Sequence, residues 1–272
     1  MPASLTEIVA ATRRRVAAIK PAADMRELER LAEDHTPRGF RSGLESAGMN
    51  GIAIIAELKR ASPSRGVIRS DFDPASLAKE LETAGAAALS VLTDAEFFQG
   101  SLENLRRASA STKLPCLRKD FIVDEFQLLE ARANHADAVL LIVAALSQSH
   151  LNRLACRAAE YQLDVLCEVH DENELQRAID LGCDLIGVNS RDLQTFKVDL
   201  ETAIRLADRI PKNALRVAES GIHNAADIAR LRATGYQAFL IGESLMKAKS
   251  PGEALKALLV EAERESHALI KK

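Results

Sequence analysis

One unit recurs along this chain and limits the folds open to it: an amphipathic helix ends at a turn residue, and an apolar strand follows directly. Four such units are visible, with Gly85, Gly182 and Gly235 at the helix end in three of them and Asn134 in the fourth. Glycine suits this position because a left-handed backbone costs it little. The recurrence is a form of internal repetition, and it predicts alternating helices and strands.

Short apolar or β-branched runs predict eight strands, at residues 52–58, 88–92, 116–118, 138–143, 165–169, 185–188, 216–218 and 238–241. Their starts lie about 20–35 residues apart, which is room for one helix and two short loops. Most runs are continuously apolar, as expected of strands buried on both faces. Eight such units predict a (β/α)8 TIM barrel. A doubly wound open sheet is the alternative, but it usually has fewer strands, and no glycine-rich dinucleotide loop follows the first strand.

The first 45 residues do not follow this alternation. Residues 5–19 and 24–34 have helical spacing, and a stretch containing glycine and serine at 39–51 leads into the first strand. These helices are too short to bury a core of their own. We therefore expect an N-terminal helical extension, residues 1–45, packed on the barrel, and a single barrel domain over residues 1–272.

Composition excludes some functional classes. The chain is 47% hydrophobic and 28% charged, which is ordinary for a soluble globular protein. A net charge of −3 provides no basic field to attract nucleic acid or anionic lipid. The N-terminus lacks a signal-peptide pattern, and no apolar run approaches membrane-spanning length. We expect a cytoplasmic protein, monomeric or weakly homo-oligomeric, without nucleic-acid or membrane partners.

The cysteines and histidines give little sign of a metal or redox site. Cys116, Cys156, Cys167 and Cys183 form no C-x-x-C pair and lie at no metal-ligand spacing from a histidine. We expect them to be reduced structural thiols, and we expect no metal ion. His170 is the one histidine near the predicted functional face, and we interpret it as a polar loop residue.

Charged and polar residues gather where the predicted strands end, and barrel enzymes build their sites from those ends. The residues in question are Glu57, Lys59, Lys119, Asp120, Glu168, Asn189, Arg191 and Glu219. Strand alternation should point at least some of the acids into the barrel mouth, where burial is costly unless cations face them. Any one of these residues could be a solvated strand end, but together they predict a ring of mixed charge that can shift pKa values.

The last two strand ends suggest an anion site. The sequences ESGI (residues 219–222) and IGES (residues 241–244) place small residues where backbone N–H groups can approach an anion. Phosphate sites in barrels commonly occupy the loops after the seventh and eighth strands. Hydroxyl groups of residues 62–64 could add donors. The alternative is that these glycines only make tight turns.

Several ordered blocks between about residues 50 and 250 strongly resemble the indole-3-glycerol phosphate synthase family of tryptophan biosynthesis. They are IIAELKRASPSRG, LSVLTDAEFFQGS, LPCLRKDFIVDEFQ, LCEVHDENEL, IGVNSRDLQTF, VAESGI and FLIGESLM. The N-terminal helices also resemble the extension found in that family. The resemblance implies a carbon–carbon lyase that converts 1-(2-carboxyphenylamino)-1-deoxyribulose 5-phosphate to indole-3-glycerol phosphate. Carbon dioxide and water leave, and no metal or organic cofactor takes part.

The resemblance also implies catalytic roles. Lys119 matches the general acid, and Glu168 matches the general base that removes the final proton. An unperturbed ammonium is a poor acid at neutral pH, so we expect an apolar pocket and the nearby cation Lys59 to lower the pKa of Lys119. Lys59 would also pair with the departing carboxylate and share proton delivery. Glu57 would orient the lysines.

Other matching positions bind or orient the substrate. Asn189 and Glu219 would position the sugar hydroxyls and the lysines, and Arg191 would anchor the carboxylate region or an active-site loop. Asp120 could brace Lys119 or cap the loop. The phosphate pocket would consist of Ser62, Ser220, Gly221, Gly242 and the backbone N–H of Glu243, whose acid should point away. The apolar wall around the aromatic ring would consist of Phe98, Phe121 and Leu140, for which core packing is the alternative.

Two other functions stay open. A related sugar-phosphate isomerase would typically use a Cys or Asp base and an Asp acid, whereas these strand ends carry Lys and Glu. A non-catalytic barrel that binds a phosphorylated metabolite should tolerate loss of Lys119 or Glu168, yet both are present.

Overall fold

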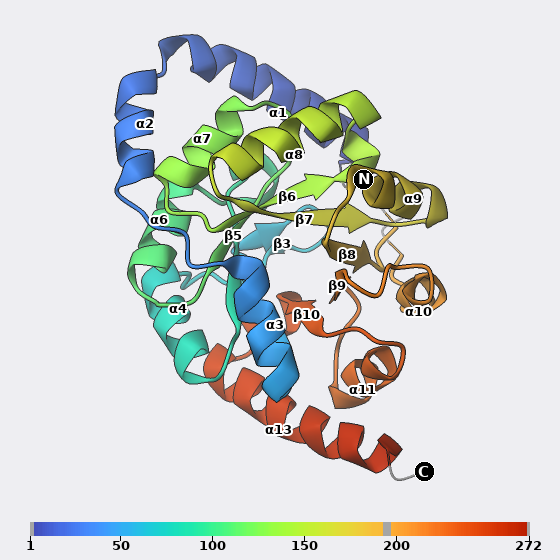
Figure 1. Cartoon of the computed structure of the whole chain (residues 1–272). Helices are drawn as coiled ribbons and strands as arrows, with labels where there is room; N and C mark the ends of the chain where they lie inside the picture. Colours follow the sequence, from blue (N-terminus) through green and yellow to red (C-terminus); the bar gives the residue numbers. More distant parts are fainter. Residues whose placement is uncertain (1–2, 193–196, 271–272) are drawn as a thin grey trace.

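The computed structural model describes residues 3–192 and 197–270, and within these residues the parallel strands close into a barrel (Figure 1). The strand order is β1-β10-β9-β8-β7-β6-β5-β4, and β1 completes the ring by pairing with both β10 and β4. The strands are β1 (Ala53–Leu58), β4 (Ala88–Leu92), β5 (Cys116–Lys119), β6 (Ala138–Ile142), β7 (Asp164–Val169), β8 (Leu185–Asn189), β9 (Leu215–Glu219) and β10 (Ala238–Ile241). The predicted (β/α)8 barrel is therefore confirmed, and the open sheet is excluded.

Helices surround the barrel and connect its strands (Figure 1). They are α4 (Pro74–Thr83), α5 (Ala95–Phe98), α6 (Leu102–Ala110), α7 (Phe126–Ala133), α8 (Gln148–Glu160), α9 (Glu172–Leu181), α10 (Glu201–Ala207), α11 (Ala225–Ala233), α12 (Glu243–Lys247) and α13 (Pro251–Ile270), with the 3-10 turn η2 at Val143–Ala145. Many begin with a side-chain cap, as at Asp73, Ser101 and Asp171, whose oxygens accept an N–H of the first turn. A small hairpin, β2 (Ala61–Ser62) and β3 (Gly66–Val67), lies in the loop after β1.

The predicted helix ends at glycine are correct. Gly85, Gly182 and Gly235 have φ values of 99°, 80° and 93°, in the left-handed region that glycine adopts without steric cost. The fourth unit differs from the prediction, because Asn134 has φ −106° and the left-handed residue is its neighbour His135, with φ 65°. The chain therefore turns one residue later there.

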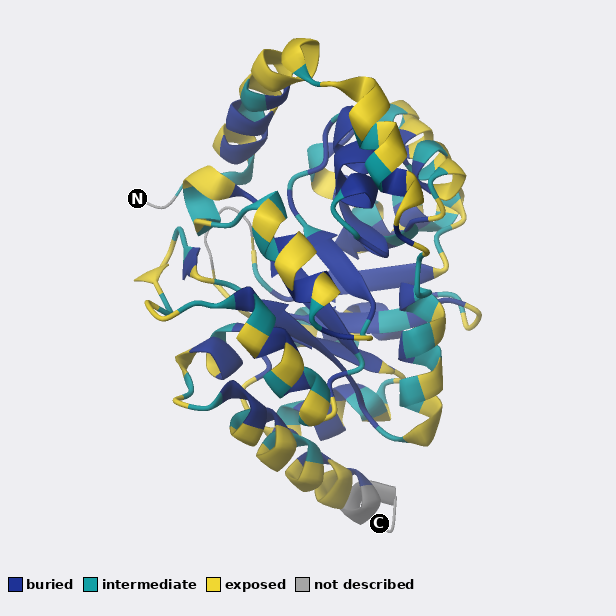
Figure 2. Cartoon of the chain, turned by 90° about the vertical axis from the view of Figure 1, so that its left-hand side faces the viewer, coloured by how far each residue is buried: buried dark blue, intermediate teal, exposed yellow. Residues whose placement is uncertain are grey.

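Apolar residues form one layer inside the barrel and another between the strands and the outer helices. Figure 2 shows the strands buried and the exposed residues on the outward faces of the helices. The inner layer includes Ile55, Leu117, Leu166 and Val217, which are fully or almost fully buried. Because alternate residues of a strand face opposite sides, the continuous apolar runs supply both layers.

The N-terminal extension consists of α1 (Leu5–Ile19), the 3-10 turn η1 (Lys20–Ala22), α2 (Met25–Glu33) and α3 (Phe40–Asn50). The first two predicted helical segments are confirmed as α1 and α2. The glycine- and serine-containing stretch forms α3, which runs through residue 45, where the extension was expected to end. Phe40 and Leu44 lie one helical turn apart and pack, fully buried, on the inner layer.

Asp137, which directly precedes β6, ties the extension to the barrel. One carboxylate oxygen accepts the N–H of Arg38 at 2.7 Å and lies 3.0 Å from Nε2 of His35. The other accepts the N–H of Cys116 at 2.7 Å. The side chain is fully buried, so these hydrogen bonds take the place of those that water would make with the carboxylate.

The structure corrects one prediction about the cysteines. Cys167 and Cys183 form a disulfide between β7 and the turn that precedes β8. The expectation of reduced thiols is wrong for this pair. Cys167 faces the layer between the strands and the outer helices, and the turn after α9 places Cys183 on that same side. Within the described residues Cys116 and Cys156 are free thiols. Over the same residues, no helix has the length and apolar character needed to cross a membrane.

Replacing Asp137 with alanine should destabilise the fold. The change removes a buried carboxylate and leaves the N–H groups of Arg38 and Cys116 without their acceptor, at a cost of about 2–5 kcal/mol. Urea unfolding should show a lower midpoint for Asp137→Ala. Asp34→Ala is the matched control, because Asp34 is exposed and its carboxylate forms a surface ion pair with Arg30, and it should shift stability by about 0.5 kcal/mol or less. Equal midpoints for the two variants would contradict this account of Asp137.

Candidate active site

A cavity opens at the C-terminal ends of the barrel strands, and every residue that the sequence assigned to a site lines it. These residues are Glu57, Lys59, Ser62, Phe98, Lys119, Phe121, Leu140, Glu168, Asn189, Arg191, Glu219, Ser220, Gly221, Gly242 and Glu243. They come from strand ends and following loops that are far apart in sequence, and closure of the barrel brings them to one rim. The fold therefore brings all of these residues to one cavity.

Lys119 stands at the centre of the charged side chains. Its Nζ lies 2.8 Å from Oε2 of Glu168, on β7, and 2.8 Å from Oε2 of Glu219, on β9. The lysine side chain is only 12% exposed, and the two carboxyl side chains are buried. One ammonium therefore links the ends of β5, β7 and β9 in a region that water reaches poorly.

The predicted lowering of the pKa of Lys119 is wrong for this geometry. Burial disfavours the ammonium, but the carboxylates of Glu168 and Glu219 outweigh burial and hold the pKa above its ordinary value. The cation expected to oppose them, Lys59, is itself paired with Glu57 at 2.5 Å. Lys119 therefore faces acids and holds its proton tightly.

The two partners of Lys119 have opposite pKa shifts. Burial alone would raise the pKa of Glu168, but Lys119 and His170 outweigh it and hold that pKa below its ordinary value. For Glu219, burial dominates over the attraction of Lys119 and, with repulsion from Glu168, raises the pKa to about 7. The second oxygen of Glu219, Oε1, is buried and has no hydrogen-bond partner among the described residues. Two acids that share one lysine thus differ in readiness to carry a proton.

Two glycines provide the space that the acids occupy. A Cβ on Gly187 would lie 2.2 Å from Oε1 of Glu219, and one on Gly242 would lie 2.5 Å from Oε1 of Glu57. Both distances are far below any tolerable contact, so neither position accepts a side chain while these carboxylates stay in place. Gly242, which the sequence assigned to phosphate binding, has this additional role.

The proposed phosphate loops have small residues in unusual backbone conformations. Ser220 and Gly221 are both left-handed, with φ values of 63° and 78°. A non-glycine residue in that region is uncommon and indicates a constrained turn. The hydroxyl of Ser62 is buried without a hydrogen-bond partner in the described part of the chain. The carboxylate of Glu243 pairs with Lys247 at 2.5 Å and with Arg65 at 3.3 Å, which neutralises it.

An apolar wall closes another side of the cavity. The rings of Phe98 and Phe121 lie 6.2 Å apart in a tilted arrangement, and Leu140 is almost fully buried. Leu5 and Ile8 of α1 also line the cavity, and sequence analysis missed them. Their spacing predicts an apolar face on an amphipathic helix. It does not predict which part of the barrel that face packs against.

At the end of β8, the side chain of Asn189 accepts the N–H of Arg191 at 3.0 Å. Arg191 also forms a backbone bridge with Val198. The last residues of the block IGVNSRDLQTF, 193–196, lie outside the described residues. Within the described ranges no group of three or more His, Cys, Asp or Glu side chains is arranged to hold a metal ion.

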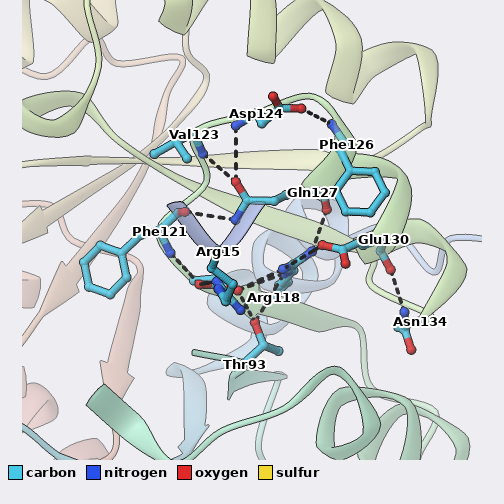
Figure 3. A network of polar contacts seen from close by, with 11 residues as sticks. Arg15, Thr93, Arg118, Phe121, Val123, Asp124, Phe126, Gln127, Glu130 and Asn134 are labelled. Atoms are coloured by element: carbon cyan, nitrogen blue, oxygen red, sulfur yellow. Dashed lines mark hydrogen bonds and ion pairs between the residues drawn. The ribbon is translucent and has the colours of Figure 1, made fainter. Parts of the chain in front are cut away.

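A network of polar contacts surrounds Arg118, the residue that precedes Lys119 on β5 (Figure 3). Arg118 donates to the carbonyl of Gln127 at 2.6 Å and pairs with Asp120 at 2.9 Å. Asp120 accepts the N–H of Phe121 at 2.8 Å and lies 3.5 Å from Arg15 of α1. Asp120 therefore pairs with arginines and not with Lys119, so the expected brace on the lysine is indirect. The network holds the end of β5, which carries Lys119, and the following loop, which carries Phe121.

The raised pKa of Glu219 can be measured directly. A ¹³C-detected NMR titration of labelled glutamate side chains should show one carboxyl titrating within about one pH unit of 7, because burial and Glu168 disfavour its ionisation. That signal should be absent from Glu219→Gln, and it should persist in the control Glu172→Gln, whose side chain is 44% exposed. A wild-type spectrum with no carboxyl titrating near neutrality would contradict the assignment.

Comparisons with known proteins agree on one family. The family model described as indole-3-glycerol phosphate synthase matches residues 5–258. A protein from Koribacter versatilis (strain Ellin345) with that name is 61% identical over 259 residues, which cover 95% of this chain and 100% of that protein. Another from Acinetobacter baumannii (strain AYE) is 50% identical over 238 residues, which cover 86% of this chain and 87% of that protein.

Solved structures with low identity share the fold alone. A thiamine phosphate pyrophosphorylase from Pyrococcus furiosus aligns with a TM-score of 0.60 at 17% identity, over 79% of this chain and 96% of that one. An orotidine 5'-phosphate decarboxylase from Pyrococcus horikoshii OT3 aligns with a TM-score of 0.58 at 13% identity, over 77% of this chain and 98% of that one.

Proposed function

The chain belongs to the indole-3-glycerol phosphate synthase family of carboxy-lyases, and we propose that it closes the indole ring of 1-(2-carboxyphenylamino)-1-deoxyribulose 5-phosphate. The observation that carries this proposal is the ammonium of Lys119, held at 2.8 Å by both Glu168 and Glu219 inside one cavity. A cation between two carboxylates of different basicity supplies the proton donor and acceptor that ring closure and aromatisation require.

The cavity walls match the ends of this substrate. The phosphate would bind to the loops at Ser220, Gly221 and Gly242, with the buried hydroxyl of Ser62 as a further donor. The aromatic ring would lie against the apolar wall, Phe98, Phe121 and Leu140, which line the same cavity. Binding at both ends would hold the ring carbon against the ketone and remove a costly orientational search.

Ring closure requires a proton on the ketone oxygen while the aromatic carbon attacks. Lys119 would deliver this proton. Its pKa is high in the free protein because Glu168 and Glu219 face it, so it would donate only when the substrate oxygen displaces one of them. Carbon dioxide would then leave from the same ring carbon, with Lys59 paired to the departing carboxylate in place of Glu57.

Dehydration and aromatisation would complete the reaction. A hydroxyl leaves as water with a proton from a lysine, and Glu168 would remove the last ring proton. Glu57 would orient Lys59, while Asn189 and Glu219 would hold the sugar hydroxyls and Arg191 would anchor the carboxylate region. Oε1 of Glu219, which has no hydrogen-bond partner among the described residues, would be an acceptor for such a hydroxyl.

Two alternatives remain testable in the same assay. A sugar-phosphate isomerase would convert a phosphorylated sugar without producing indole fluorescence. A non-catalytic phosphometabolite-binding barrel would bind the substrate and leave it unchanged. The paired lysines and glutamates favour ring closure over isomerisation, because an isomerase of the typical kind uses a Cys or Asp base with an Asp acid. Against a non-catalytic barrel stands the presence of both Lys119 and Glu168 in one cavity.

Lys119→Ala should abolish turnover and keep phosphate binding. Indole fluorescence should fall by at least about 10²-fold relative to wild type, since general acid catalysis typically contributes that much. Affinity for inorganic phosphate, measured by calorimetry, should stay within about tenfold because Lys119 does not lie in the phosphate loops. The exposed Lys113→Ala is the matched control and should behave as wild type. Turnover that survives in Lys119→Ala would refute the acid assignment.

Glu168→Gln should slow a late step. Glutamine keeps the size of the side chain but cannot accept the final proton, so stopped-flow absorbance should show a cyclised intermediate that accumulates, or steady-state turnover should fall. Glu160→Gln, on the exposed end of α8, is the control. Unchanged kinetics in Glu168→Gln would remove this residue from the mechanism.

A further inference from the structure

The imidazole of His170 lies between two carboxylates just beyond β7. Its Nε2 is 3.3 Å from Oε1 of Glu168, and its Nδ1 is 2.9 Å from Oε2 of Glu174. The side chain is 13% exposed, and it does not line the cavity that Glu168 lines. Sequence analysis interpreted His170 as a polar loop residue, and the structure shows it behind the carboxylate of Glu168.

Glu174 holds the imidazole in place from the first turn of α9. Its Oε2 accepts the backbone N–H of His170 at 2.9 Å in addition to contacting Nδ1. Its own N–H donates to the capping carboxylate of Asp171 at 2.8 Å. The side chain of Glu174 is only 16% exposed. The imidazole is therefore fixed by a carboxylate that belongs to a capped helix and not to a free loop.

The two carboxylates favour the protonated form of His170. Burial opposes protonation of His170, but Glu168 and Glu174 outweigh it and raise its pKa to about 10. Both ring nitrogens therefore carry protons at neutral pH. Nε2 has no aligned hydrogen bond within the described residues, so its interaction with Glu168 is an ion pair. On the other side, Lys119 of β5 contacts Oε2 of Glu168.

We propose that His170 and Glu174 are positioning residues for Glu168, because the imidazolium attracts Oε1 and leaves Oε2 directed at Lys119 and the cavity. This inference rests on the proposed function, in which Glu168 is the general base. Fixing one carboxylate oxygen away from the cavity removes rotational freedom of the base. The charged groups that face this unit are Lys119 from β5 and, beyond it, Glu219 from β9.

The imidazolium also acts on the basicity of Glu168. A positive charge beside the carboxylate favours its ionised form, so the imidazolium lowers the pKa of Glu168. Without it, Glu168 would become protonated at higher pH. The acid limb of the kcat profile should then move to higher pH. A residue that only supported the loop would change stability or kcat without moving that limb.

The test is a pH profile of steady-state kinetics, from about pH 5 to pH 10, with indole fluorescence as the readout. His170→Gln should lower kcat by about tenfold, keep KM within about twofold and shift the acid limb upward. His170→Lys keeps a positive charge and should restore the position of the limb. Glu174→Gln removes the outer carboxylate, lowers the pKa of His170 and should bring the alkaline limb to lower pH than in wild type.

Matched variants separate this inference from its premise. Glu172→Gln, in the same first turn of α9 but exposed and paired with Arg209, should leave both limbs in place. Adding His170→Gln to Glu168→Gln should cause no further loss of kcat, since His170 acts through Glu168. Thermal unfolding of each variant identifies any that fails to fold, and His170→Lys then carries the test.

The outcomes are distinguishable. If Glu168→Gln is impaired but His170→Gln keeps the wild-type kcat and acid limb, the positioning role is wrong and the proposed function stands. A lower kcat with an unmoved limb in His170→Gln also overturns it, in favour of a structural role. If Glu168→Gln is fully active, the base assignment fails whatever His170 does.

Discussion

The site depends on one buried ammonium shared by two carboxylates. Without the charge of Lys119, Glu168 and Glu219 would be two acids buried close together with like charge, an arrangement that burial and repulsion both oppose. With it, three strand ends are tied across the barrel mouth at 2.8 Å. The cost of burying the cation is met by the same two acids, so none of the three side chains can be explained alone.

The rest of the molecule keeps that arrangement in place. Gly187 leaves room for the carboxyl of Glu219. Arg118, the buried residue that precedes Lys119, donates to the carbonyl of Gln127 and so ties the end of β5 to α7. At the opposite end, Phe40 and Leu44 of α3 seal the barrel interior with apolar side chains. The polar groups of the candidate site lie at the other rim, where the cavity opens.

Much of this could be predicted from sequence, for identifiable reasons. Strands buried on both faces appear as continuous apolar runs, and the observed strand ends lie within one residue of the predicted ones. Strand ends then identify one rim, so residues such as Glu57 and Gly242 could be grouped without coordinates. Distances across the barrel could not be predicted, because sequence gives the direction of a side chain but not its partner. The contacts of Lys119 with Glu168 and Glu219, and the disulfide of Cys167 with Cys183, join different parts of the barrel and depend on such distances.

The charge distribution also explains how an anionic substrate could enter a cavity rich in glutamates. From the sequence alone, the glutamates at the strand ends would be expected to repel the phosphate and the carboxylate of the substrate. In the structure their charges are reduced or already neutralised. Glu219 has a pKa of about 7, so it carries a proton for part of the time at neutral pH. Glu243 is neutralised by Lys247 and Arg65. Glu57 is paired with Lys59, and substrate anions can compete for that lysine. Because each of these acids faces a cation, an incoming anion would, under the proposed function, exchange partners with existing ion pairs instead of meeting uncompensated negative charge. The proton of Lys119 would then become available for transfer only after the substrate had displaced one of its carboxylates.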